Sequence, residues 1–219
     1  MTAIKTEARR QLAEVGAPAL SLRSIARELG MVSSAVYRYV SSRDELLTLL
    51  IVDAYDSIGA AAEHAAGSSR TRSPAKRWLT VCRAVRTWAL AHPHEYALVY
   101  GSPVPGYAAP VDTISPAIRV SAALIGVIAD AHAAGHVGRG GELGRIPRQV
   151  RRDADAIAAA LGTDLPDEVV IRALIAWTQL FGLISFELFG QTRNGITDHD
   201  ALFTVTTTAT ATLLGLTTE

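Results

Sequence analysis

Apolar residues recur at the spacing of an α-helix along most of the chain. A first helix is indicated by one apolar face that Gly16 and Pro18 bring to an end: Ile4, Ala8, Leu12 and Val15. Ser21 is placed to cap a second helix, and Gly30 to end it, around the apolar positions Leu22, Ile25, Ala26 and Leu29. A very short third helix is expected over 33–39, and Ser42 is placed to cap a fourth that runs past Tyr55.

The rest of the chain repeats this helical pattern, so we predict an all-α fold. Further helices are expected from Ser73-Pro74 to about His92, from Ser115-Pro116 through Ile128, and over 166–189 and 198–214. The threonines of "FTVTTTATATLLGL" alternate as in a strand, but the helical context favours helix there. The Gly- and Arg-rich segment 135–152 is interpreted as a mobile, solvated linker.

Composition narrows the class of protein further. The 219 residues are 49% apolar, which predicts much buried surface, and their 21 basic and 21 acidic side chains leave no net charge. The single cysteine excludes an internal disulfide, and no signal peptide is evident. The longest apolar run, 169–189, contains Arg172, Gln179 and Glu187, so we interpret it as a buried helix. A cytoplasmic protein with no membrane partner is expected.

The segment "SLRSIARELGMVSSAVYRYVSSRDELL" has the geometry of a helix-turn-helix. Ala26 is small where two helices would cross, Gly30 allows the turn, and Val36 and Val40 would point inward. The opposite surface would carry Ser33, Ser34, Tyr37 and Arg38, polar groups that suit base edges and phosphates in a major groove. Arg43 would reach the flanking backbone. A solvated three-helix unit without DNA is the alternative.

The same segment resembles the N-terminal domain of TetR-type bacterial transcriptional regulators, and "WALAHPHEYALVYGSPVPGY" resembles one of their C-terminal domain types. The resemblance implies a DNA-binding domain near 1–46 and a ligand-binding and dimerisation domain over 47–219. It implies that one set of residues fixes the phosphate backbone: Ser21, Arg23, Tyr37, Tyr39 and Arg43. Ser33, Ser34 and Arg38 would lie nearest the bases. Val32 stands where a capping Ser or Thr is usual, so Ser33 is an alternative cap.

The helix over 166–189 shows a heptad-like apolar seam and a second apolar face, which requires two partners. Because TetR-type proteins dimerise through their last two helices, we expect the homodimer interface to include six residues: Leu174, Trp177, Phe181, Ile184, Leu188 and Phe203. A central helix of a monomer is the plain alternative. A dimer would place two recognition helices on a palindromic operator.

Aromatic residues with polar tips suggest a pocket for a small, largely apolar ligand. The residues expected to line it are Trp88, His92, Tyr96, Tyr100, Tyr107, Ile125 and Trp177. Ordinary core packing is the alternative for each of them, and His92 would otherwise cap the helix that Pro93 ends.

An enzyme is disfavoured because no catalytic motif is complete. His94-Glu95 starts a zinc-protease pattern, but Leu98 occupies the place of its second histidine. We therefore expect no catalytic residues, no metal and no cofactor. The sequence predicts a DNA-binding regulator. The family resemblance implies a repressor, the commoner outcome in the family, that binds its operator as a homodimer and is released by a ligand. A helical adaptor is the alternative, and a small helical enzyme is a weaker one.

Overall fold

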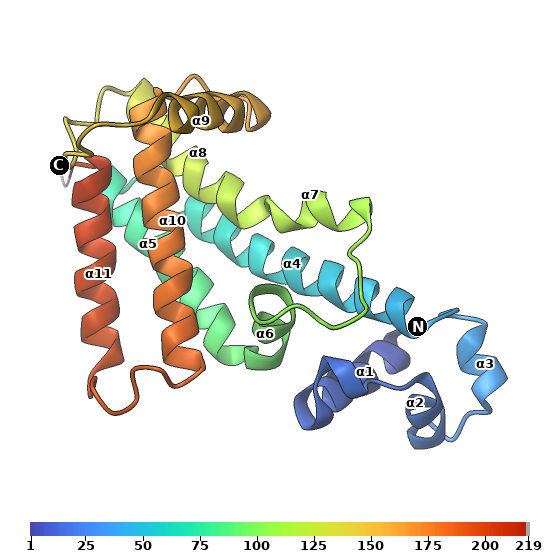
Figure 1. Ribbon diagram of the computed structural model, residues 1–219. Helices are drawn as coiled ribbons and strands as arrows, with labels where there is room; N and C mark the ends of the chain where they lie inside the picture. The colour runs from blue at the N-terminus through green and yellow to red at the C-terminus, as the bar shows by residue number, and fades with distance from the viewer. Residues whose placement is uncertain (218–219) are drawn as a thin grey trace. The chain divides into compact units, whose positions relative to one another are not determined.

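The computed structural model describes residues 1–217. Within that range every regular element is helical, which confirms the predicted fold class, and the only β-pairing is an isolated bridge between Val137 and Leu216 (Figure 1). The chain forms two compact units, one made of Met1–Gly59 with Ala89–Ile118 and the other of Ala60–Trp88 with Arg119 onward.

The first unit contains the N-terminal helices and a short helical segment from the middle of the chain. Its elements are α1 (Thr2–Val15), η1 (Ala17–Ala19), α2 (Leu22–Glu28), α3 (Ser33–Tyr37), the start of α4 (Arg43–Ser68), α6 (Pro93–Tyr100), η2 (Val111–Thr113) and α7 (Ile114–Ala117). Ile4, Leu12, Ile25 and Val36 are buried in one core, whereas Val15 is 55% exposed. The predicted inward face of the first helix is therefore wrong at Val15, which is the last residue of α1.

The predicted caps of α2 and α4 are confirmed, and that of α3 is not. The Ser21 hydroxyl accepts a hydrogen bond from Ser24 N, and the Ser42 hydroxyl accepts one from Glu45 N at 3.0 Å. The Glu45 carboxylate accepts bonds from both the backbone N–H and the hydroxyl of Ser41, which lowers its pKa. Helix α3 starts after Val32 without any side-chain cap.

The second unit holds the longer helices. They are the end of α4, most of α5 (Pro74–Ala91), α8 (Arg119–Ala133), α9 (Arg148–Ala160), α10 (Asp167–Leu188) and α11 (His199–Leu214). Helix α10 packs against α9 and α11. Val111–Ala133 and Asp167–Leu188 are long and apolar enough to cross a membrane, but buried Arg172 and the Arg86–Glu187 ion pair of 2.7 Å fit α10 to a protein core.

The threonine-rich segment is helical, as predicted. Its hydroxyls donate to carbonyls one turn earlier, as Thr207 does to Phe203 O at 2.7 Å and Thr208 to Thr204 O at 2.7 Å. These bonds satisfy the buried hydroxyl of Thr207 and the exposed hydroxyl of Thr208 within the helix itself, so the segment is helical despite the β-propensity of threonine.

The predicted mobile linker over 135–152 is wrong in two respects. Its end, from Arg148, belongs to α9, a helix that the sequence reading missed. Its start is fastened to the C-terminal segment, because Gly138 N donates to Gly215 O at 2.8 Å and Gly141 N to Leu213 O at 2.9 Å. A Cβ at Gly140 would come within 2.7 Å of Leu213 O, so this contact requires glycine.

Candidate functional site

Helix α3 presents a polar face because its opposite face is fixed in the core. Val36 and Val40 are fully buried, as predicted, and Met31 N donates to Ala26 O at 2.8 Å across the turn that Gly30 makes with φ of 65°. The face directed away from the core exposes the side chains that the sequence predicted: Ser33, Ser34, Tyr37, Arg38 and Tyr39. Tyr37 and Tyr39 are 44% and 55% exposed, which is unusual for aromatic residues without a partner surface.

The other predicted DNA contacts differ from one another. Arg23 is exposed on α2, whereas the Ser21 hydroxyl is engaged in the cap of that helix. The Arg43 guanidinium donates through Nη2 to Ala17 O at 2.9 Å and to Pro18 O at 3.3 Å. Arg43 therefore fastens the start of α4 to the η1 turn.

Within the first unit, helix α1 is joined to α4 and α6 by ion pairs. Asp53 of α4 accepts hydrogen bonds from Lys5 at 2.8 Å and from Arg9 at 2.6 Å, and Arg9 lies 3.8 Å from Glu95 of α6. Leu98, Val104 and Tyr107 pack against the core that α1 to α4 share. The Tyr107 and Thr48 hydroxyls lie 2.9 Å apart, which joins the segment after α6 to α4.

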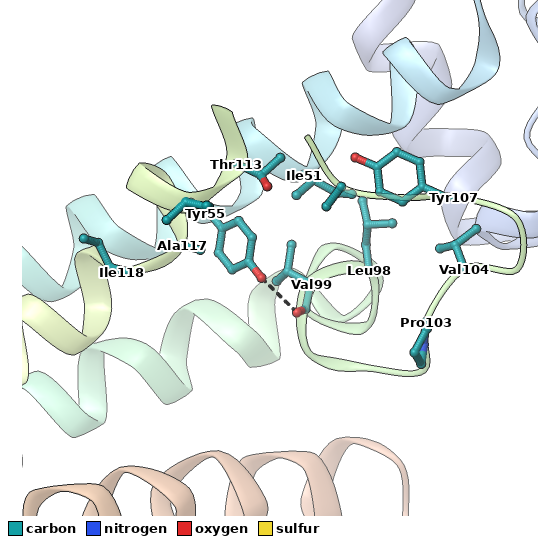
Figure 2. A pocket seen from close by; sticks show the side chains of 12 residues that line it. Ile51, Tyr55, Leu98, Val99, Pro103, Val104, Tyr107, Thr113, Ala117 and Ile118 are labelled. Atoms are coloured by element: carbon teal, nitrogen blue, oxygen red, sulfur yellow. Dashed lines mark hydrogen bonds between the residues drawn. The ribbon is translucent and has the colours of Figure 1, made fainter. Parts of the chain in front are cut away.

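A cavity of about 380 Å³ lies among α4, α6, η2 and α7. Figure 2 shows Ile51 and Tyr55 of α4, Leu98 and Val99 of α6, and Thr113, Ala117 and Ile118 around one space. Pro103, Val104 and Tyr107 complete the wall on the side of the segment after α6. Leu98, Val104 and Tyr107 thus face the cavity and also pack against the helix-turn-helix core.

Only Tyr107 of the predicted pocket residues lines this cavity. Tyr96 and Tyr100 lie behind its wall: the rings of Tyr55 and Tyr100 are 5.9 Å apart, and those of Tyr96 and Tyr100 are 5.1 Å apart. His92 occupies the N-cap position of α6 without a side-chain capping bond. The other three predicted residues, Trp88, Ile125 and Trp177, belong to the second unit.

The predicted interface residues fall into a buried group and a partly exposed group. Ile184 and Phe203 expose 0% and 1% of their surface and are core residues of the second unit, and Phe181 exposes 8%. Leu174, Trp177 and Leu188 are partly exposed. Because a buried side chain offers no surface to a second chain, the predicted interface needs revision at Ile184 and Phe203. Exposed apolar residues do lie on the same two helices or directly after α10: Ile175, Phe186, Phe189 and Val205.

The short helix α3, held by an apolar anchor behind a tight turn and exposing hydroxyls and an arginine, defines a helix-turn-helix DNA-binding protein. The chain matches the description "Bacterial regulatory proteins, tetR family" over residues 4–50, and "Tetracyclin repressor-like, C-terminal domain" over residues 78–210. It belongs to the TetR family of transcriptional regulators, which is not an enzyme family.

Known proteins agree with this assignment over most of the chain. The HTH-type transcriptional regulator Rv1816 of Mycobacterium tuberculosis is 46% identical over 184 residues, which span 84% of this chain and 78% of the relative. The crystal structure of a regulatory protein, SCO4313, superimposes with a TM-score of 0.77 at 36% identity and covers 95% of this chain and 93% of its own. The TetR family regulator PfmR of Thermus thermophilus, 17% identical, shares the fold with a TM-score of 0.60, covering 96% of each chain.

Proposed function

We propose that this regulator is a homodimeric repressor that binds a palindromic operator and is released when a small, largely apolar ligand binds. Residues 1–46 would bind DNA, and residues 47–219 would hold the ligand and dimerise. The observation that carries the proposal is the exposed polar face of α3 on a chain that belongs to the TetR family. The regulator would act in the cytoplasm.

The DNA contacts divide into positioning and reading groups. Tyr37, Tyr39 and Arg23 have exposed donors suited to phosphates, and Ser33, Ser34 and Arg38 lie on the part of α3 that would meet base edges. Ser21 and Arg43 would support the backbone contact chiefly by holding the ends of α2 and α4.

The first experiment selects bound fragments from a random double-stranded DNA pool with the intact protein and with Tyr37→Ala. We expect the intact protein to enrich a palindrome that the variant does not retain, because Tyr37 would contact phosphates in both half-sites. Val150→Ala, a truncation at a 39% exposed site on α9, serves as the control and should select as the intact protein does. A folded protein that enriches no sequence would argue against operator binding.

The exposed apolar face of α10 and α11 supports the dimer. Ile175 is 41% exposed, Phe186 56% and Val205 67%, and α10 packs against α11, so these side chains extend over neighbouring helices. Two copies related by a two-fold axis would each bury this face against the same face of the other. The revised interface thus keeps the last two helices but uses their exposed residues.

Phe186→Glu tests this interface. A carboxylate on each side of a two-fold contact would be desolvated beside its counterpart, so we expect monomers in sedimentation velocity and much weaker operator binding. Val150→Glu introduces the same charge at an exposed position of α9 and should stay dimeric. A dimer that persists in Phe186→Glu would place the interface elsewhere.

Ligand control is supported by the shared wall of the cavity. A molecule in the cavity would press on Leu98, Val104 and Tyr107, which pack on the helix-turn-helix core. If the ligand favours a conformation of this wall in which the recognition helices no longer fit the operator, ligand and DNA exclude each other.

A further inference from the structure

We infer that the cavity among α4, α6, η2 and α7 is the effector site, that its ligand is an uncharged apolar molecule, and that Ile118 of the α7 side sets this selectivity. The inference rests on the proposed ligand control and specifies its site and ligand class. It also moves the site away from Trp88, Ile125 and Trp177, which lie in the other unit.

The wall of the cavity holds no carboxylate, ammonium, guanidinium or imidazole side chain among its twelve residues. A charged ligand would lose its hydration there without gaining a counter-ion, which disfavours its binding in an apolar site. Burial raises the pKa of Tyr55, so its phenol also stays neutral. The uncharged wall therefore disfavours both anionic and cationic ligands.

The hydroxyl protons at the wall are already in use. Tyr55 Oη donates to Val99 O at 3.2 Å (Figure 2). Thr113 Oγ1 donates to Pro110 O at 2.7 Å. Thr48 Oγ1 donates to Asp44 O at 2.9 Å, so in the 2.9 Å contact between Thr48 and Tyr107 the Tyr107 hydroxyl is the donor. These side chains can accept a hydrogen bond from a ligand but have no proton left to donate. A carboxylate or phosphate needs donors and would find none among them.

The mouth of the cavity is apolar as well. Ile114 and Ile118 line the cavity and are nevertheless 58% and 46% exposed, which places them where the cavity opens to solvent. Ile118 directly follows α7, and Figure 2 shows it at the end of the cavity away from Tyr107. A ligand would pass these side chains first, so a charge at position 118 would change which molecules are accepted.

Matched aromatic probes test the ligand class by calorimetry on the full-length protein without DNA. We expect 1-naphthol, neutral at pH 7, to bind at least about tenfold more tightly than 1-naphthoate, whose carboxylate would be desolvated. Ala117→Trp should abolish naphthol binding because its side chain would fill the cavity. Ala156→Trp, at an exposed position of α9, is the matched control and should bind as the intact protein does. Circular dichroism verifies that both variants fold.

Ile118→Lys then tests the selectivity. We expect it to shift the preference towards 1-naphthoate by about tenfold, because the ammonium at the mouth supplies the missing counter-charge. Equal or tighter binding of naphthoate by the intact protein would overturn the inference. So would naphthol binding that survives Ala117→Trp, no binding of either probe, or an unchanged preference in Ile118→Lys. Binding that leaves operator affinity unchanged in a separate titration would instead contradict the proposed ligand control.

Discussion

Arg43, which is proposed to support the contact with DNA, makes hydrogen bonds within the protein. The family resemblance assigns it to the phosphate backbone, but its guanidinium is bonded to the carbonyls of Ala17 and Pro18. Its side chain is 30% exposed, and its Nε is buried without a hydrogen-bond partner in the part of the chain that the structure describes. Arg43 therefore joins the start of α4 to the turn that precedes α2, and so supports the helices around α3.

Replacing Arg43 with lysine should destabilise the protein as well as weaken DNA binding. Lysine cannot hold both carbonyls with a planar fork, so we expect a loss of about 1 kcal/mol in urea unfolding, together with weaker operator binding. Arg38→Lys is the control: Arg38 is exposed, so only DNA affinity should change. Unchanged stability in Arg43→Lys, with DNA binding weakened as in Arg38→Lys, would indicate that Arg43 contacts a phosphate directly.

At the scale of the element, α11 carries two buried threonines whose hydroxyls make different hydrogen bonds. Thr207 donates to Phe203 O, which is a bond inside the helix. Thr210 also accepts a bond from Trp78 Nε1 of α5 at 3.2 Å, and that indole is 1% exposed. Thr210 is thus the hydrogen-bond partner of a buried donor on another helix.

A matched pair of valine substitutions measures how much each of these hydrogen bonds contributes to stability. Thr210→Val would leave the Trp78 N–H buried without its acceptor, so we expect a loss of about 1–3 kcal/mol in the free energy of unfolding. Thr207→Val removes a hydroxyl that bonds only within α11, so no buried donor on another helix loses its acceptor. Its effect on the free energy of unfolding should therefore be smaller. Urea denaturation followed by tryptophan fluorescence measures both. Equal losses would mean that the Trp78 bond adds nothing to stability.

The elements that the sequence predicted well are those with local signals. Ser21 and Ser42 cap the helices that they were expected to cap, and Val36 and Val40 are buried as their spacing indicated. Helix α9 was missed because its alanines and arginines continue a segment that glycines mark as a loop. Even so, buried Ala154 and Ala158 stand four residues apart, a helical spacing that was open to detection.

At the scale of the whole molecule, the site depends on contacts that no local pattern contains. The cavity brings Ile51 of α4 together with Leu98 of α6 and Ala117 of α7, and most of its wall is aliphatic. Most of the predicted aromatic residues with polar tips therefore lie behind this wall, as Tyr96 and Tyr100 do, or belong to the second unit. Likewise, periodicity showed that α10 is apolar on two faces but not which face the chain itself covers, so Ile184 was assigned to the interface.

The proposed two-fold symmetry predicts the salt dependence of DNA binding. Each phosphate contact contributes about 0.9 to the slope of log affinity against log salt concentration. Because a dimer repeats every contact, Arg23→Gln should lower the magnitude of the slope by about 1.8 in fluorescence titrations from 50 to 200 mM salt. Arg152→Gln on α9, an equal loss of charge on exposed surface outside the helix-turn-helix, should leave the slope unchanged. A decrease of about 0.9 in Arg23→Gln would mean that one subunit alone makes this contact, and an unchanged slope would remove Arg23 from the DNA-binding surface.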